Sequence, residues 1–177
     1  MEKLIRKPII EKISPEQLAQ LVGDTGLDTA VLERWSEMIS NDLLIVLAVT
    51  TGANYIGRAN LWLAEADEEA VRAYFPGIPL VNALQVNESA RNMGIGSMLM
   101  QGLEDEALRR GFTAIGLGVE PDNQKAIDLY AKRGYEFKML GQEVTYTTGW
   151  WETSEDRSTK WYEVTARFML KKLSEAS

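Results

Sequence analysis

Residues 91–97 combine an arginine with two glycines directly before a helical pattern. The segment reads Arg91-Asn92-Met93-Gly94-Ile95-Gly96-Ser97, and apolar residues follow at helical spacing as far as Ala107. Glycine lets the backbone turn tightly and approach a ligand closely. The first N–H groups of a helix lack an intrahelical acceptor, and the helix dipole adds positive potential there. The segment is therefore suited to bind a pyrophosphate, although a plain tight turn into a helix would also explain these residues.

Two further patterns follow along the chain. Gly116 and Gly118 share one face of an expected strand, which predicts that a helix or a ligand packs close to them. Residues 123–132 predict a helix in which Tyr130 shares a face with Ala126. Taken alone, Tyr130 is more typical of a packed aromatic side chain than of a catalyst.

Other phosphate-binding motifs fit less well. The P-loop pattern G-x-x-x-x-G-K-[ST] occurs nowhere in the sequence. A dinucleotide fingerprint would need a third small residue at position 99, which is Leu99. Glu120 does lie roughly where a ribose-binding acid belongs, so this alternative is weakened but stays open.

The composition removes much of the usual catalytic chemistry. The chain has 177 residues, no Cys and no His, and 19 Lys plus Arg against 26 Asp plus Glu, which gives a net charge of −7. Thiolate nucleophiles, Ser-His-Asp triads and Cys or His metal ligands are excluded, and we expect no metal site. Proton transfer then falls to Asp, Glu, Tyr, Lys, the amino terminus or water. The acidic balance argues against nucleic-acid binding.

The expected elements describe one α/β (α+β) domain over residues 1–177 with a mixed sheet. The N-terminus lacks a signal peptide and the longest apolar run is far too short for a bilayer, so we expect a cytoplasmic protein that does not bind membranes. The strands are expected at Leu4–Ile13, Leu43–Thr51, Tyr55–Ala64, Leu80–Val86, Thr113–Val119, Tyr135–Thr147 and Trp161–Leu170. The helices are expected from Ser14-Pro15, at Asp28–Ile39, Glu65–Tyr74, Gly94–Arg110 and Asn123–Lys132.

Together these patterns resemble the GNAT family, the Gcn5-related N-acetyltransferases. Arg91-x-x-Gly94-x-Gly96 is similar to the pyrophosphate loop of that family, and Asn123-x-x-Ala126-x-x-Leu129-Tyr130-x-x-x-Gly134-Tyr135 is similar to its second cofactor segment. The resemblance covers residues 80–137 well and the remainder through element order. It implies a mixed, mostly antiparallel sheet of six to seven strands, flanked by about four helices. The strands around Val86 and Val119 are expected to splay apart.

The resemblance also implies the cofactor and the site. Acetyl-CoA would lie between the splayed strands and transfer its acetyl group directly to a primary amine. Tyr130 would act near the sulfur as the general acid. The cofactor-binding residues would be Leu84, Gln85, Val86, Arg91, Asn92, Met93, Gly94, Ile95, Gly96, Ser97, Asn123 and Tyr130.

The acceptor is less constrained by the sequence. Members that acetylate protein N-termini often carry a Glu at the position of Gly118, and Glu88, Glu120 and Glu143 are alternative acids. A small cationic amine, such as a polyamine or an amino sugar, is favoured by the net charge, by the acidic Glu65, Asp67, Glu68 and Glu69, and by the aromatic Trp62, Trp150 and Trp151. A solvated connector would also explain the acidic residues, and a packed core or a dimer interface would also explain the tryptophans. A peptide or protein acetyltransferase and a non-catalytic acyl-CoA- or nucleotide-binding module are the alternatives, and the family suggests a homodimer through the final strands.

Overall fold

The computed structural model describes residues 7–22, 29–137, 141, 143–153 and 159–174. Within these ranges it has five α-helices, one for each helix expected from the sequence patterns, and one 3₁₀ turn. The elements are β1 (Ile9–Lys12), α1 (Pro15–Val22), α2 (Thr29–Ser40), β2 (Leu44–Thr51), β3 (Asn54–Trp62), α3 (Glu69–Tyr74), β4 (Leu80–Val86), the 3₁₀ turn η1 (Glu88–Ala90), α4 (Ile95–Arg109), β5 (Ala114–Val119), α5 (Gln124–Lys132), β6 (Thr145–Thr153) and β7 (Thr159–Lys172).

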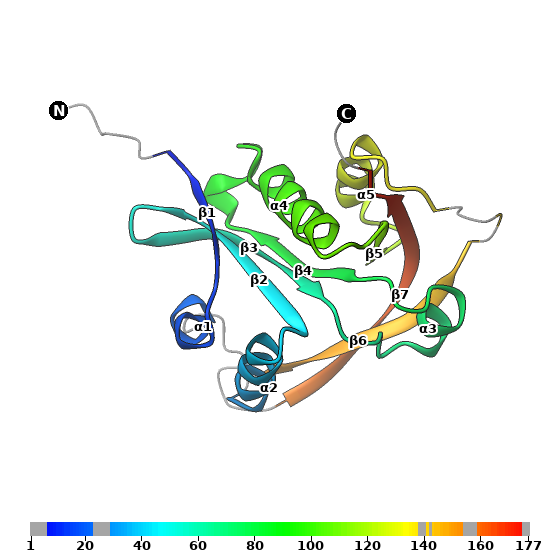
Figure 1. Cartoon of the computed structure of the whole chain (residues 1–177), viewed down its shortest axis with the longest axis horizontal. Helices are drawn as coiled ribbons and strands as arrows, with labels where there is room; N and C mark the ends of the chain where they lie inside the picture. The colour runs from blue at the N-terminus through cyan, green and yellow to red at the C-terminus, as the bar shows by residue number, and fades with distance from the viewer. Residues whose placement is uncertain (1–6, 23–28, 138–140, 142, 154–158, 175–177) are drawn as a thin grey trace.

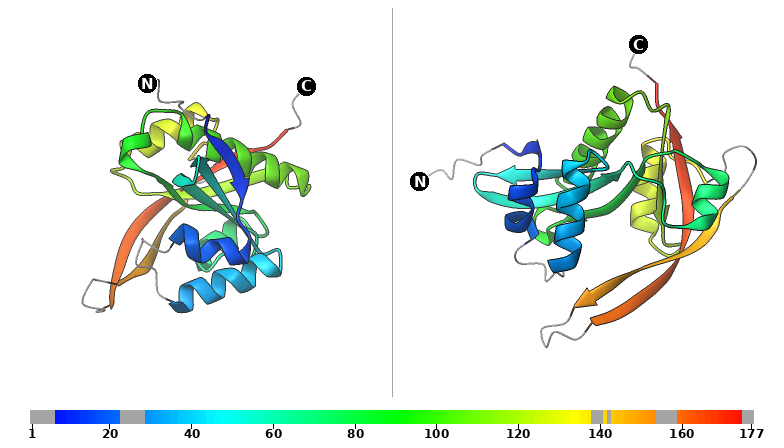
Figure 2. Two further views of the ribbon diagram at one scale, coloured as in Figure 1. Left: turned by 90° about the vertical axis from the view of Figure 1, so that its left-hand side faces the viewer. Right: turned by 60° about the horizontal axis from the view of Figure 1, so that its bottom comes forward.

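A single seven-stranded sheet runs through the molecule in the order β1-β2-β3-β4-β5-β7-β6. Among the strands of the described ranges, β4 and β5 form the one parallel pair, and all other neighbours are antiparallel. In Figure 1 and Figure 2, α1 and α2 lie against one side of the sheet, whereas α4 lies against the other. The expected mixed, mostly antiparallel sheet is confirmed.

The strand β2 is buried on both faces because helices cover both sides of this half of the sheet. Leu44 to Val49 are all buried, and a continuous apolar run is typical of a strand covered on both faces. From the other side, Leu99, Leu103 and Ala107 of α4 are fully buried at helical spacing. Burying each such leucine stabilises the fold by about 1.5–3 kcal/mol. This packing fixes α4 across the centre of the sheet.

The helix expected at Glu65–Tyr74 forms only in its second half, from Glu69 onward. The first half is held in a turn by side chains. The guanidinium of Arg72 donates to the carbonyl oxygens of Ala66 and Asp67 at 2.6 and 2.7 Å. These carbonyls are bound by a side chain instead of by helical N–H groups, so the helix begins after them.

The prediction of a strand at Tyr135–Thr147 was wrong over most of its length. The isolated bridge between Glu136 and Leu170 is the β pairing found before β6 in the described part of this stretch, and Gly141 has a φ of 79°, which an extended strand does not accommodate. The strand β6 begins at Thr145 instead. Trp150 and Trp151, which were expected beside a loop, are consequently within β6, and their side chains lie outside the described part of the structure.

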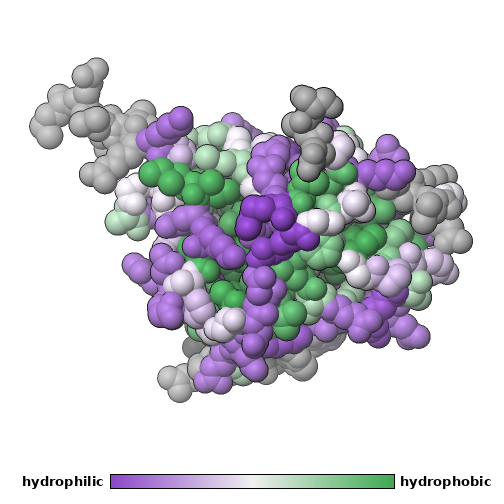
Figure 3. All heavy atoms as spheres, viewed as in Figure 1, coloured by the Kyte–Doolittle hydropathy of each residue, from purple (hydrophilic) through white to green (hydrophobic). Residues whose placement is uncertain are grey.

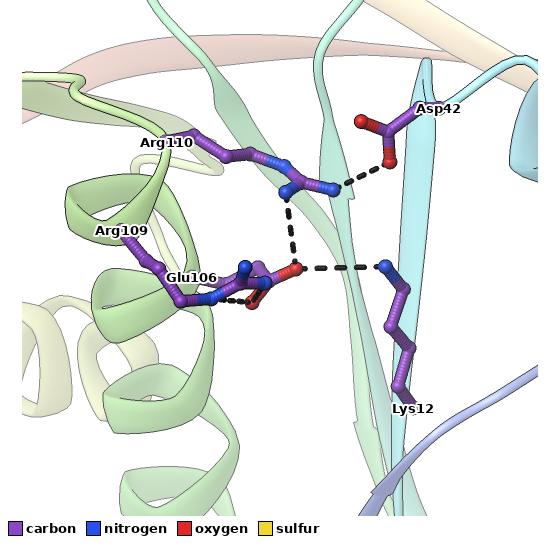
Figure 4. A network of polar contacts seen from close by, with 5 residues as sticks. All are labelled: Lys12, Asp42, Glu106, Arg109 and Arg110. Atoms are coloured by element: carbon purple, nitrogen blue, oxygen red, sulfur yellow. Dashed lines mark hydrogen bonds and ion pairs between the residues drawn. The ribbon is translucent and has the colours of Figure 1, made fainter.

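The C-terminal end of α4 is tied to the edge of the sheet by charged side chains (Figure 4). One oxygen of the Glu106 carboxylate lies 3.6 Å from Lys12 Nζ and 3.4 Å from Arg110 Nη1. The other oxygen accepts hydrogen bonds from Arg109, and Arg110 also pairs with Asp42.

In Figure 3, which shows the same face as Figure 1, the most hydrophilic side chains gather near the middle, with apolar side chains around them.

Candidate active site

The sheet opens between β4 and β5. Two residue pairs, Leu80–Gly116 and Val81–Leu117, join these strands, and their pairing ends there. Beyond this point β4 continues along β3, whereas β5 continues along β7. The two strands therefore diverge, as the family resemblance implied, and one edge of β4 is left without a strand beside it.

A bulge in β4 lies at this opening. The register between β3 and β4 shifts there, and Ala83 has a positive φ of 52°. Just beyond, the Asn87 N–H donates to the Ile56 carbonyl on the β3 side at 2.9 Å. Because backbone groups alternate along a strand, the N–H and C=O of Val86 point away from β3. They face the opening, where an extended ligand can hydrogen-bond to them as an added strand would.

The N-terminus of α4 lies next to this edge. Its N-cap residue is Gly94, with a φ of 79°, so no capping side chain binds the first N–H groups. The first backbone hydrogen bond runs from the Met98 N–H to the Gly94 carbonyl at 2.9 Å. The N–H groups of Ile95, Gly96 and Ser97 precede it and have no acceptor within the helix. These donors and the positive end of the helix dipole form a site for an anion.

The two glycines keep this site open. A Cβ on Gly94 would meet nothing within 4 Å, and a Cβ on Gly96 would meet Leu129 at 3.5 Å and Val86 at 4.0 Å. The space above Gly94 is therefore free of protein atoms, whereas Gly96 lies at ordinary contact distance from Leu129 and Val86. A side chain at Gly94 would occupy that space.

A groove of about 1110 Å³ runs over the helix terminus, between the end of β4 and α5. This volume is enough for a ligand larger than most drug-sized molecules. Two of the predicted site residues do not line this groove: Met93, which is 59% exposed, and Tyr130, which is buried. The predicted residues that line it are Leu84, Gln85, Val86, Arg91, Asn92, Gly94, Ile95, Gly96, Ser97 and Asn123.

Arg91 lies at the rim with its charge partly paired. Its Nη1 is 3.2 Å from the Glu88 carboxylate, and its Nε donates to the Val86 carbonyl at 3.4 Å. About half of the side chain is exposed, so a more strongly charged ligand can compete with Glu88 for it. Arg91 thus lines the groove near the end of β4, and Glu88 partly offsets the positive charge that it adds.

The helix α5 supplies the opposite wall. The Asn123 side-chain carbonyl accepts from the Ala126 N–H at 3.1 Å and so caps the helix, which leaves the amide nitrogen of Asn123 as its donor toward the groove. Lys125 and Lys132 also line the groove, and both were missed at the level of sequence. Their spacing of two helical turns is the signal that could have found them, because it places both ammonium groups on the wall that α5 presents.

Comparison with known proteins decides the family. A model of the acetyltransferase (GNAT) family matches residues 16–135. The chain belongs to the GNAT family. A mycothiol acetyltransferase of Jonesia denitrificans is 30% identical over 106 residues, which are 59% of this chain. The match spans 30% of the length of that curated relative.

Solved structures agree on the GNAT fold. An N-acetyltransferase of Staphylococcus aureus Mu50 matches with a TM-score of 0.68 at 17% identity, covering 95% of this chain and 99% of that chain. The acetyltransferase yncA of Salmonella typhimurium, whose structure holds its cofactor acetyl-CoA, matches with a TM-score of 0.66 at 17% identity, covering 97% of this chain and 96% of that chain. At such identities the likeness shows the fold.

The GNAT tyrosine candidate, Tyr130, is buried beneath the groove. It belongs to the same apolar cluster as Ile95 and Val119, and its ring centroid lies 6.0 Å from that of Tyr135. Burial raises the pKa of Tyr130 to about 12, because the phenolate would lose its hydration. The hydroxyl therefore keeps its proton throughout the neutral pH range.

The glycines of β5 make room for other side chains of the sheet. A Cβ on Gly116 would overlap the ring of Phe168 on β7, and a Cβ on Gly118 would overlap the hydroxyl of Tyr146 on β6. The expectation of a helix or a ligand beside them was therefore wrong. Some GNAT members carry a Glu at the position of Gly118, and here the hydroxyl of Tyr146 occupies the space that such a side chain would need. Burial and the nearby Glu68 carboxylate raise the pKa of this tyrosine.

The acidic segment before α3 is partly neutralised within the protein. Asp67 lies 3.4 Å from Arg34, whose guanidinium stacks over the Trp62 ring at 5.3 Å. Glu68 accepts a hydrogen bond of 2.7 Å from the Thr148 hydroxyl. The exposed Glu65 lines a small pocket of about 190 Å³ that lies beside α3.

The other acids considered as proton acceptors have different surroundings. Glu88 pairs with Arg91 at the rim of the groove. Glu143 lies 3.4 Å from Arg167, and Glu120 is exposed at the end of β5. Among these three, Glu88 is the acid that lines the groove.

In the described part of the chain, neither a metal-binding cluster nor a membrane-spanning helix occurs. No group of three or more Asp and Glu side chains there is arranged to hold a metal ion. None of the helices in the described ranges has the length and apolar character needed to cross a bilayer.

Proposed function

We propose that the protein transfers the acetyl group of acetyl-CoA to the primary amine of a small acceptor. The carrying observation is the groove that leads from the N-terminus of α4 to the unpaired edge of β4. One end of this groove offers anion-binding N–H groups and the other offers backbone groups in extended conformation. A diphosphate joined to a long amide-containing arm matches both ends.

The residues present fit acetyl-CoA. The N–H groups from Asn92 to Ser97 would bind the diphosphate, supported by Lys125 and Lys132 on the opposite wall. The backbone of Leu84, Gln85 and Val86 would bind the pantetheine arm, with Asn123 donating from α5. The open space above Gly94 supports this assignment, because a side chain there would crowd the phosphates.

The chemistry needs no Cys or His. When bound, acetyl-CoA supplies an activated acetyl group as a thioester. The acceptor amine attacks the thioester carbonyl, so that a C–N bond forms and the C–S bond breaks. The Val86 N–H would stabilise the negative charge on the carbonyl oxygen. Tyr130 would donate its proton to the departing sulfur, since its hydroxyl is protonated at neutral pH.

The amine must lose a proton before it attacks. At a pKa near ~10.4, only about a thousandth of such an amine is neutral at pH 7.4. A carboxylate acting through ordered water would take the proton. The acceptor therefore arrives as a cation, and the net charge of −7 and the exposed Glu65 and Glu69 favour its approach.

Replacing Tyr130 with Phe tests the catalytic part of the proposal. We expect kcat to fall about 10²- to 10⁴-fold, the usual contribution of a general acid. Affinity for acetyl-CoA should stay within a few-fold of the parent, because the N–H groups at the start of α4 and the backbone of β4 supply most of the binding contacts. Steady-state rates of CoA release and a calorimetric titration with acetyl-CoA measure the two quantities.

Tyr135→Phe is the matched control, since Tyr135 is a neighbouring buried tyrosine of the same cluster. It should leave kcat within a few-fold of the parent. An unchanged kcat in Tyr130→Phe would reduce Tyr130 to a packing residue. A titration of the parent protein that gives no heat with acetyl-CoA would refute the proposed function itself.

A further inference from the structure

The face of the sheet that α1 and α2 cover carries two buried polar side chains on β3. Arg58 is 7% exposed and Asn60 is completely buried. Their register neighbours on β2 are Ala48 and Val46, which belong to the apolar cluster under α1 and α2. In the left view of Figure 2, both helices lie against this side of the sheet. The two polar residues therefore interrupt an apolar layer.

Among the described residues, the contacts that hold Arg58 in place include no counter-charge. Its Nε donates to the Gln85 side-chain oxygen at 3.1 Å, and its guanidinium lies over the Trp35 ring at 5.6 Å from the centroid. Its Nη1 is buried and has no hydrogen-bond partner among the described residues. Burial lowers the pKa of Arg58, because its charged form loses hydration there. A negative group beside Nη1 would relieve this.

Asn60 has the same deficiency. Within the described part of the chain, neither its side-chain oxygen nor its side-chain nitrogen has a hydrogen-bond partner. Buried polar atoms in folded proteins are nearly always paired, so exceptions call for an explanation. Arg58 and Asn60 lie on adjacent positions of one face of β3. Their nitrogen donors can thus serve the same small group.

The position of this pair relates it to the groove. Gln85, which binds Arg58 on the face under α2, is itself exposed and also lines the groove. Asn82, the register neighbour of Asn60, is exposed as well. The Arg58–Gln85 hydrogen bond therefore connects the buried pair to the strand that borders the opening of the sheet. The acetyl group would be delivered at this same strand.

Planar carboxylates match the available donors. A guanidinium and a side-chain amide supply two N–H groups for two oxygens, and such charge-assisted bonds are among the strongest hydrogen bonds in proteins. We propose that Arg58 and Asn60 bind the carboxylate of the acceptor, which is therefore a small free amino acid. This inference rests on the proposed function. It narrows the acceptor from any cationic amine to one with a carboxylate near its amine, and it disfavours polyamines.

The first test compares acceptors that differ in one charge. Free amino acids are compared with the matching amino acid amides and with polyamines, at saturating acetyl-CoA, by the rate of CoA release. We expect kcat/KM to be about 10- to 100-fold higher for the acids, the size of one or two charge-assisted hydrogen bonds. Equal rates for acids and amides, or faster reaction of polyamines, would overturn the inference while leaving the proposed function intact.

Arg58→Met then tests the residue. This variant should remove the advantage of the acids over the amides and leave the affinity for acetyl-CoA unchanged. It should unfold at the same denaturant concentration as the parent or at a higher one, because it removes an unpaired buried charge. Arg34→Met is the matched control, since Arg34 also stacks on a tryptophan but lies at the surface.

Two further measurements cover the remaining outcomes. If Arg58→Met does not fold, Arg58→Lys keeps a charge but loses the planar fork of the guanidinium, and we expect about a tenfold loss of kcat/KM for the acids alone.

Binding is measured without turnover by the thermal shift that N-acetyl amino acids cause in the presence of CoA. N-acetyl amino acids with a free carboxylate should raise the melting temperature of the parent protein but not that of the Arg58 variants. The corresponding amides should not raise the melting temperature of the parent. An absent shift, or equal shifts for acids and amides, would overturn the inference. Failure to bind acetyl-CoA would instead refute the proposed function.

Discussion

The two ends of α4 use their charges and backbone groups in opposite ways. At the C-terminal end, Glu106 lies among Lys12, Arg109 and Arg110, and its contact with Lys12 joins the helix to β1. Arg110 also pairs with Asp42, just before β2 (Figure 4). Basic side chains near a helix C-terminus also interact favourably with the helix dipole. This end is fully engaged with the protein.

The N-terminal end is engaged only through its apolar face. Ile95 is 2% exposed and packs in the core, but Gly94 provides no capping side chain and a Cβ there would touch nothing. The first N–H groups of the helix are left for a ligand. The contrast teaches that a helix terminus can stay unsatisfied when the rest of the helix is anchored elsewhere.

The largest expected effect is on the open end. Gly96→Phe would place a ring where a Cβ already meets Leu129 and Val86 of the groove wall, and so would obstruct the approach of the diphosphate to the N-terminal N–H groups. Losing two charge-assisted hydrogen bonds of about 1.5–3 kcal/mol each lowers affinity for acetyl-CoA about 10²- to 10⁴-fold. Calorimetric titration measures it.

Gly111→Ala is the control for this variant at the opposite end of the same helix. Gly111 has a φ of 84° and open space around it, so the change should reduce stability by about 1 kcal/mol without altering affinity. If Gly96→Phe kept the affinity of the parent, the contrast between the two ends would be wrong.

The next effect concerns the middle of α4. Glu104 is 4% exposed and accepts from Arg133 at 3.0 and 2.7 Å and from Lys171 at 2.7 Å. Glu104→Gln would leave two half-buried cations without their anion, and we expect about 3 kcal/mol lower stability in urea unfolding. Asp105→Asn, on the exposed side of the same turn, should change stability by less than about 0.5 kcal/mol. Similar losses in both variants would contradict this role of Glu104.

The smallest effect concerns the charged end and depends on pH. Burial opposes ionisation of Glu106, but the hydrogen bond from Arg109 and the charges of Arg109, Arg110 and Lys12 outweigh it and lower its pKa below 4.5. The ionised carboxylate thus stabilises the fold above the ordinary pKa of 4.5, and this contribution is lost as pH falls through the lowered value. Glu106→Gln should cost about 1 kcal/mol at pH 7 and flatten the acid side of the stability curve. A stability difference that persists unchanged at pH 3 would refute this account.

Much of the fold could be predicted because its signals are local. Ser14 and Gln17 exchange hydrogen bonds at the start of α1, with Ser14 N–H donating to Gln17 at 3.0 Å, as the capping pattern predicts. The periods of β4 and α4 gave bounds within a residue of those observed. The error at Tyr135 arose because short alternating patterns occur in irregular segments too, and pairing with β7 decides where β6 begins.

In the candidate site too, the features made by local sequence could be predicted and those made by long-range contacts could not. The glycine loop before α4 and the cap at Asn123 were predictable, because both are made by consecutive residues. Arg58 and Asn60 were not singled out, since their burial depends on α2 and on strand pairing far along the chain. The alternation of β3 is the signal that could have found them, because it places both residues on the face opposite Ala59.

Tyr146 has a consequence for how this protein could change its substrate. Its hydroxyl occupies the volume that a side chain at Gly118 would need. Converting the protein to the arrangement with an acid on β5 therefore requires at least two substitutions, one to vacate the space and one to introduce the carboxylate. Either change made first would be harmful, by overlap or by a void, so evolution toward that chemistry would have to cross an unfavourable intermediate.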